Sequence, residues 1–153
     1  MLKKIGIALL AGVVWLSGTS VSAGDKGKIR VVIIDGWNNH QWPLTTPVMQ
    51  KALEDSGKFS VEISTSEKRN QEKLIPAGWK SGAFPPDLSK FDVVLSNYNG
   101  PAWPVELQKS LDSNLKDGKI ALVIVHAANN SFGNWNEYRQ MVGMGWYLSL
   151  IHI

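Results

Sequence analysis

One apolar run near the start of the chain constrains the fold more than any other feature. The segment "KIRVVIID", residues 28–35, is an almost unbroken series of β-branched residues that ends in an acid. A strand with one solvated face alternates apolar and polar residues, whereas a strand covered on both faces of a parallel sheet is apolar along its whole length. The segment therefore predicts a doubly buried strand in a parallel sheet.

Strands and helices are predicted to alternate along the rest of the chain. Further strands are expected over residues 59–64, 91–97 and 119–125, and the alternating "FSVEIS" of the first suits an edge strand. Helices are expected from a Thr46 cap with Pro47 to Gly57, from Pro104 to Gly118, and over residues 135–142. Residues 65–90 read as a long polar loop, with a short helix over residues 67–74 as the alternative. This alternation predicts an α/β fold with right-handed crossovers and a mostly parallel sheet covered on both sides.

The N-terminal segment reads as an export signal over residues 1–23. Two lysines precede an apolar stretch of 12 residues, and a small-x-small pattern ends at Ala23. The stretch is shorter than the ~20 residues that a membrane-spanning helix needs. The mature protein is therefore expected to be periplasmic or secreted, with no membrane contact after cleavage; the alternative is an uncleaved anchor.

The C-terminal hexapeptide "LSLIHI", residues 148–153, reads as a non-native tail. It matches one reading frame of a transposase adapter used in sequencing libraries, and it follows the preceding helix abruptly. The alternative is a genuine C-terminal strand. With the tail set aside, residues 24–147 are expected to be the N-terminal part of a longer α/β domain, whose sheet is incomplete because of the truncation.

Charge and cysteine content exclude several classes of function. Without the signal the net charge falls to +1, and the longest basic run is Lys68-Arg69, so no nucleic-acid partner is expected. The chain has no cysteine. Disulfides, a thiolate nucleophile and cysteine-based metal sites are therefore excluded.

Polar and aromatic residues follow three of the predicted strands. In an open α/β sheet, ligands bind outside the carboxyl ends of the strands, so the loops over residues 35–42, 97–103 and 126–130 are expected at one edge. Amides and ring faces suit an uncharged polar ligand such as a sugar. The alternative is that the tryptophans only pack the loops and the asparagines only shape turns. The candidate substrate-binding residues are Trp37, Asn38, Asn39, Asn97, Tyr98, Asn99, Trp103, Asn129 and Asn130.

Two histidines are the candidate catalytic residues. His126 sits in a small-residue turn between a strand and a helix, where α/β enzymes place a nucleophile elbow. Its ring could act as an acid or base near pH 7 or bind a metal, or it could only form a hydrogen bond at the sheet edge. In a strand order 2-1-3-4, the parent strands of His40 and His126 lie about 10 Å apart, and the His40 loop is long enough to close that gap. Further metal ligands are not evident, so no metal site is assigned and the cofactor stays open.

Three segments carry a resemblance to a known family. They are "VVIIDGWNNHQW", "FDVVLSNYNG" and "VIVHAANNSFGNWNEYRQMVGMGW", which together span about residues 29–146. They resemble the trehalose-utilisation (ThuA-like) family, specifically its exported members. The resemblance implies a three-layer, flavodoxin-like fold related to class I glutamine amidotransferases. Those enzymes carry a catalytic cysteine at the elbow, whereas this chain has His126-Ala127, so glutaminase activity is not expected.

The resemblance also implies a role in disaccharide or 3-keto-sugar catabolism. The first hypothesis is a sugar-processing enzyme (a hydrolase, lyase or isomerase) that uses His126 as acid or base with His40 as its partner. The second is a non-catalytic carbohydrate-binding or sensing module. The third is a fragment without activity of its own.

Overall fold

A computed structural model describes residues 27–143, so the expected export signal and the expected non-native tail lie outside the described residues. The elements are β1 (Ile29–Asp35), α1 (Trp42–Asp55), β2 (Phe59–Thr65), β3 (Val93–Ser96), α2 (Val105–Lys116), β4 (Ala121–Ile124) and α3 (Asn136–Val142), with 3-10 turns at Glu72–Leu74, Leu88–Lys90 and Ala128–Asn130. Within the described part of the chain, no helix is long and apolar enough to cross a bilayer.

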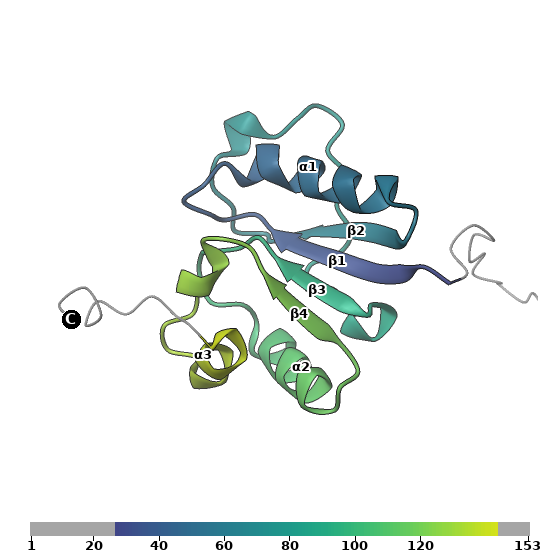
Figure 1. Cartoon of the computed structure of the whole chain (residues 1–153). Helices are drawn as coiled ribbons and strands as arrows, with labels where there is room; N and C mark the ends of the chain where they lie inside the picture. Colours follow the sequence, from purple (N-terminus) through teal and green to yellow (C-terminus); the bar gives the residue numbers. More distant parts are fainter. Residues whose placement is uncertain (1–26, 144–153) are drawn as a thin grey trace, which may run out of the picture.

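The four strands form one parallel sheet in the order β2-β1-β3-β4 (Figure 1). Ile33 of β1 pairs with Ile63 on one side and Leu95 on the other, which places β1 in the middle. Its last five residues are all buried, as its apolar sequence predicts. The parallel sheet and the expected strand order are confirmed, and so is β2 as an edge strand of the described sheet.

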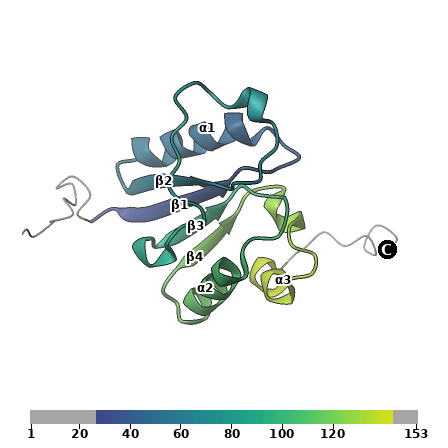
Figure 2. The same ribbon diagram turned by 180° about the vertical axis from the view of Figure 1, so that it is seen from behind.

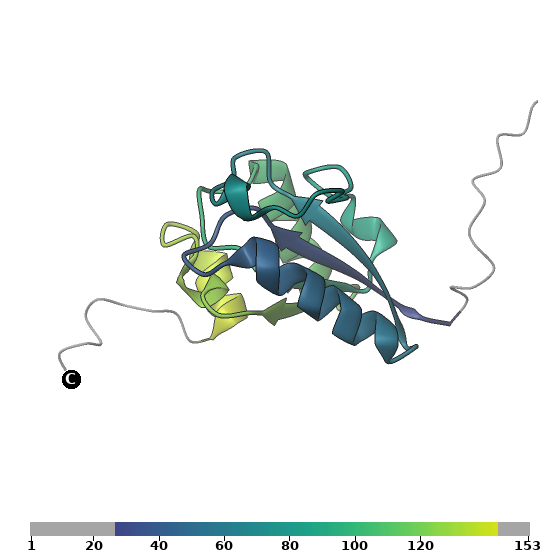
Figure 3. The same ribbon diagram turned by 90° about the horizontal axis from the view of Figure 1, so that it is seen from above.

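Helices cover both faces of the sheet and complete three layers. Helix α1 packs on one face over β1 and β2, whereas α2 and α3 lie on the opposite face (Figures 1 and 2). Seen from above, α1 runs along the sheet beside β1 (Figure 3). Alternate residues of β1 feed two separate cores: Val32 and Ile34 pack toward Leu107 and Leu111 of α2, and Ile33 belongs to the core under α1. The fold is therefore the expected flavodoxin-like α/β arrangement.

Two helix boundaries differ from the prediction. Helix α1 begins at Trp42, four residues before the expected Thr46 cap, and Pro47 lies inside it. The indole of Trp42 is fully buried and donates from Nε1 to the side-chain oxygen of Asn70 at 3.0 Å, so a distant contact fixes the start of the helix. The alternative helix over residues 67–74 is only a 3-10 turn at Glu72–Leu74.

Candidate functional site

The carboxyl ends of the four parallel strands bring four loops to one edge of the sheet, here called the rim: residues 36–41, 66–71, 97–103 and 125–131 (left in Figure 1). Hydrogen bonds join these loops directly. Asn70 N donates to the carbonyl of Gly36 at 3.0 Å, and the Ser131 hydroxyl donates to the carbonyl of Tyr98 at 2.6 Å. Asn99 N donates to the carbonyl of Trp37 at 2.7 Å. The rim is thus one connected surface, at the place where open α/β sheets bind ligands.

The structure brings His40 and His126 together on the rim. Their ring centroids lie 4.9 Å apart, and the ring planes are inclined by 52°. Both residues are exposed, and neither ring has a hydrogen-bond partner within residues 27–143. Two imidazoles with free nitrogen atoms therefore face solvent side by side, one in the loop after β1 and the other in the loop after β4.

The backbone of His40 is fixed by its neighbours. His40 N donates to the side-chain oxygen of Asn38 at 2.9 Å, and the His40 carbonyl accepts from Trp42 N at 2.8 Å. Gln71 Nε2 donates to the carbonyls of both Asn38 and His40, each at 2.9 Å. We call this arrangement of Asn38 and Gln71 around His40 the clamp. It holds the His40 loop against the loop that follows β2.

His126 is held by the end of β4 and by a short turn. Val125 N donates to the carbonyl of Ser96 at 3.0 Å, and the two alanines after His126 are fully buried. The His126–Ala127 peptide bond is cis. A 3-10 turn at Ala128–Asn130 follows, and α3 begins only at Asn136. His126 therefore lies in a turn between β4 and α3, as the sequence predicts, and the chain passes Ser131, which is bonded to Tyr98, before α3 begins.

Two of the predicted substrate-binding asparagines lie beneath the rim. Asn38 and Asn97 are buried, and Asn38 Nδ2 donates to Asn97 Oδ1 at 3.2 Å. Asn97 Nδ2 in turn donates to the hydroxyls of Thr45 and Thr46 at 3.1 and 3.0 Å. The expectation that Asn97 orients substrate hydroxyls is therefore corrected, since its amide already bonds within the protein and ties the rim to α1.

The remaining asparagines lie higher on the rim. Asn39 is exposed and accepts a hydrogen bond from Asn99 Nδ2 at 3.2 Å, so the β1 and β3 loops are joined by amides. Asn129 and Asn130 are half-buried. The side-chain oxygens of these two residues are buried without a hydrogen-bond partner, which is uncommon for folded proteins. Of these four amides only that of Asn39 is exposed, and Asn129 and Asn130 can offer their amide nitrogens but not their buried oxygens.

The aromatic side chains mostly belong to the core. Tyr98 and Trp103 are each 2% exposed and pack against Phe132, with centroid distances of 5.8 and 4.8 Å. The expectation that they form an open ring wall is corrected, because burial leaves almost no ring surface for a ligand. Trp37 is half-buried and lies against Gly100, where an added Cβ would come within 2.5 Å of it.

A buried carboxyl lies under the same edge. Asp35 ends β1, is 0% exposed, and neither carboxyl oxygen has a hydrogen-bond partner. Burial raises the pKa of Asp35 to about 7; the hydroxyls of Thr46 and Thr65 are near enough to lower it by a smaller amount, although neither meets the geometry of a hydrogen bond. Asp35 lies under the rim and has no exposed surface, so it does not contact a ligand in this conformation.

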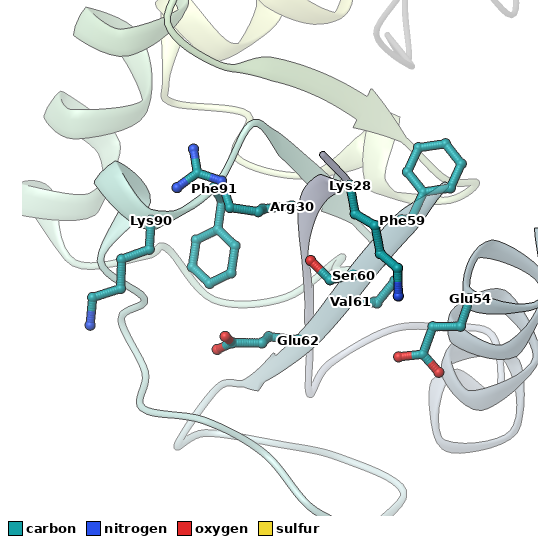
Figure 4. Close-up of a pocket in the computed structure, with 9 residues that line it drawn as sticks. All are labelled: Lys28, Arg30, Glu54, Phe59, Ser60, Val61, Glu62, Lys90 and Phe91. Carbon is teal, nitrogen blue, oxygen red and sulfur yellow. The ribbon is translucent and has the colours of Figure 1, made fainter. Parts of the chain in front are cut away.

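A cavity of about 420 Å³ lies at the opposite edge of the sheet, near the amino ends of β1 and β2 (Figure 4). Its charged lining residues carry both signs: Lys28, Arg30, Glu54, Glu62 and Lys90. Arg30 is already paired with Asp92 at 2.6 Å. This mixture of positive and negative side chains favours no class of ligand. The cavity also lies at the edge of the sheet opposite the two histidines. Residues 27–143 contain no group of three or more acidic or histidine side chains that could hold a metal ion.

Sequence reasoning missed Asn70 and Gln71. They lie in the long polar loop after β2, in which the sequence analysis named no site residue. Their position in the fold could have indicated them. Strand β2 lies beside β1 in a parallel sheet, so the loop after β2 must begin at the same rim. In the structure Asn70 Nδ2 donates to the carbonyl of Asn38 at 2.7 Å and supplements the clamp.

Comparison with known proteins supports the fold. No family model matches the chain, and no curated protein matches it. A solved structure of a protein described as ThuA-like, from Parabacteroides merdae ATCC 43184, matches with 30% sequence identity and a TM-score of 0.66. The match covers 79% of this chain and 40% of that chain, so this chain spans less than half the length of the protein that it resembles.

Proposed function

We propose that this chain is part of an exported ThuA-like protein of carbohydrate catabolism, and that its rim acts on a disaccharide or 3-keto sugar by histidine-dependent acid–base chemistry. The observation that carries the proposal is the pair of exposed imidazoles 4.9 Å apart, with ring nitrogens that no described residue engages. Histidine is the side chain that exchanges protons most readily near neutral pH. The solved ThuA-like structure supports the family part of the proposal.

The chemistry follows from the acidity of a keto sugar. A C–H bond next to a carbonyl loses its proton more easily than other sugar C–H bonds, because the resulting negative charge moves onto the carbonyl oxygen. His126, as a neutral imidazole, accepts this proton, and His40, as an imidazolium, donates a proton to the oxygen. Two rings this close can reach adjacent atoms of one substrate. The amide of exposed Asn39 and the side-chain amide nitrogens of half-buried Asn129 and Asn130, whose oxygens are buried, are the groups that can bind hydroxyl groups.

The first test measures proton abstraction directly. A 3-keto disaccharide is incubated with the full chain in D2O, and proton NMR follows the loss of the C–H signal next to the carbonyl. His126→Gln and His40→Gln should each slow the protein-dependent exchange by about 10² or more. His152→Gln, which changes the one other histidine of the sequence, should exchange at the unmodified rate. Unchanged exchange in both rim variants would show that the pair is not catalytic.

The second candidate function is a carbohydrate-binding or sensing module without catalysis. It is favoured by the exposed amide of Asn39 and the amide nitrogens of Asn129 and Asn130, which can bind hydroxyls without any titrating group. Disaccharide binding that stays constant from pH 5 to 8 and survives replacement of both histidines would support this function. Binding that disappears with the histidines would favour the enzyme.

A further inference from the structure

We propose that the His40–His126 pair is also a binding site for one divalent transition-metal ion of the zinc and nickel class, and that bound metal excludes acid–base chemistry at the pair. The first part stands on geometry alone. The second part rests on the function proposed above, so the two parts are tested separately.

The separation of the rings matches a shared metal ion. An imidazole nitrogen binds zinc at about 2.0–2.1 Å, and a tetrahedral ion holds two ligands at about 109°. Two rings on one such ion therefore have their centroids roughly 5 Å apart. The observed separation is 4.9 Å, so the two loops already hold the rings at the spacing that a shared ion requires.

The site is also accessible and held in advance. Both rings are exposed, and neither must break a hydrogen bond with another residue of the described chain to bind an ion. The clamp fixes the backbone of His40, and the Val125–Ser96 hydrogen bond fixes the approach to His126. Ligands fixed before binding lose less conformational entropy when the ion arrives, so affinity rises.

The ligand types select the class of metal. Neutral imidazole suits zinc, copper, nickel and cobalt, whereas magnesium and calcium prefer oxygen. Among residues 27–143 the pair has no third histidine or acid positioned to complete a protein cage. The ion would therefore keep water on its remaining positions, as in an open site. The whole sequence contains no cysteine that could compete for the ion.

Metal binding and proton transfer use the same electron pair. A ring nitrogen that donates its lone pair to the metal cannot accept a proton from a substrate carbon, and a protonated ring nitrogen cannot bind the metal. Occupancy of the pair by an ion therefore removes both the base and its acid partner. In the proposed enzyme, the ion is an inhibitor that a chelator reverses.

The binding test uses the full chain without an affinity tag, titrated with NiCl2 and separately with ZnCl2 by calorimetry. We expect one ion per chain, with binding weakened at least about tenfold in both His40→Gln and His126→Gln, because each removes one of two ligands. His152→Gln is the matched control and should bind like the unmodified chain. Thermal unfolding of each variant without metal checks that the fold is intact. Absence of a stoichiometric site, binding by either rim variant as tight as that of the unmodified chain, or loss of binding in His152→Gln would each overturn the proposal.

The exclusion test adds metal to the exchange assay. One equivalent of Zn²⁺ or Ni²⁺ should suppress deuterium exchange, and EDTA should restore it. Faster exchange with metal would overturn the exclusion while leaving the binding site intact. A chain that binds the ion but never catalyses exchange would contradict the proposed function and not the metal site.

Discussion

Asp35 makes the stability of the protein depend on pH. Its pKa is raised from 3.8 to about 7 because the carboxyl is buried without a partner, so ionisation opposes folding. The native state binds more protons than the unfolded state between about pH 4 and pH 7, and the free energy of unfolding falls as pH rises through that window. Above pH 7 the penalty is complete, at most roughly 4 kcal/mol.

Replacement of Asp35 by asparagine tests this directly. Asp35→Asn keeps the shape and removes the charge, so it should be more stable than the unmodified chain at pH 8, by up to roughly 4 kcal/mol. The advantage should shrink to less than about 1 kcal/mol near pH 4, where the carboxyl is neutral in the native state and only about half ionised in the unfolded state. Urea unfolding at pH 4, 6 and 8 measures both values. If the free energies of unfolding of the two proteins changed by the same amount between pH 4 and pH 8, the assignment of the pH dependence to Asp35 would be refuted.

Gly36 allows the chain to leave β1 beside Ser66. Its φ is +115°, and an added Cβ would lie 2.6 Å from the Ser66 hydroxyl and 2.8 Å from its backbone nitrogen. Gly36→Ala should therefore lower the free energy of unfolding by roughly 3 kcal/mol, from backbone strain and from displacement of the β2 loop. Gly57→Ala is the control, because Gly57 also has positive φ, at +72°, but nothing lies within 4 Å. Gly57→Ala should lower the free energy of unfolding by only about 1 kcal/mol. If Gly36→Ala and Gly57→Ala lowered it equally, the contact with Ser66 would not be the cause of the loss.

At the scale of elements, the loop after β2 controls the loop after β1. Gln71→Ala removes both hydrogen bonds that its amide donates to the Asn38 and His40 carbonyls. The His40 loop should open more often, and the Trp42 N–H that bonds to the His40 carbonyl should exchange with solvent about tenfold faster. Gln50→Ala on α1, outside the rim, should leave this exchange rate unchanged. Hydrogen exchange by NMR measures both, and an unaffected Trp42 amide in Gln71→Ala would show that the clamp is unnecessary.

Strands were easier to predict than helix starts. The apolar run of β1 and the alternation of β2 depend on which faces each strand buries. These patterns can be recognised from the consecutive residues of the strand alone. The start of α1 is not local, because Trp42 is anchored by Asn70, 28 residues further along. Thr46 and Pro47 form a credible capping signal, but burial of the Trp42 indole adds a further turn before it.

At the scale of the whole molecule, topology explains which part of the site was predictable. Parallel strands in the order 2-1-3-4 place the loops of His40 and His126 at one edge, so their meeting followed from the alternation of strands and helices. The alternation of strands and helices did not predict how deeply each loop residue is buried. Trp103 and Asn97 read as ligand contacts in the sequence, yet helices α2 and α1 cover them, and only the packed layers reveal this.

The three layers cover the sheet unevenly, and this asymmetry can be measured with one residue type. Val94 of β3 is 0% exposed in the core beneath α2, whereas Val123 of neighbouring β4 is 45% exposed on the face that α1 leaves open. Val94→Ala should cost roughly 2 kcal/mol or more, since it leaves a cavity, and Val123→Ala should cost less than about 1 kcal/mol. Both changes remove the same two methyl groups from adjacent strands. Equal losses in urea unfolding would mean that something covers the β4 face in solution, and the uneven covering described here would then be wrong.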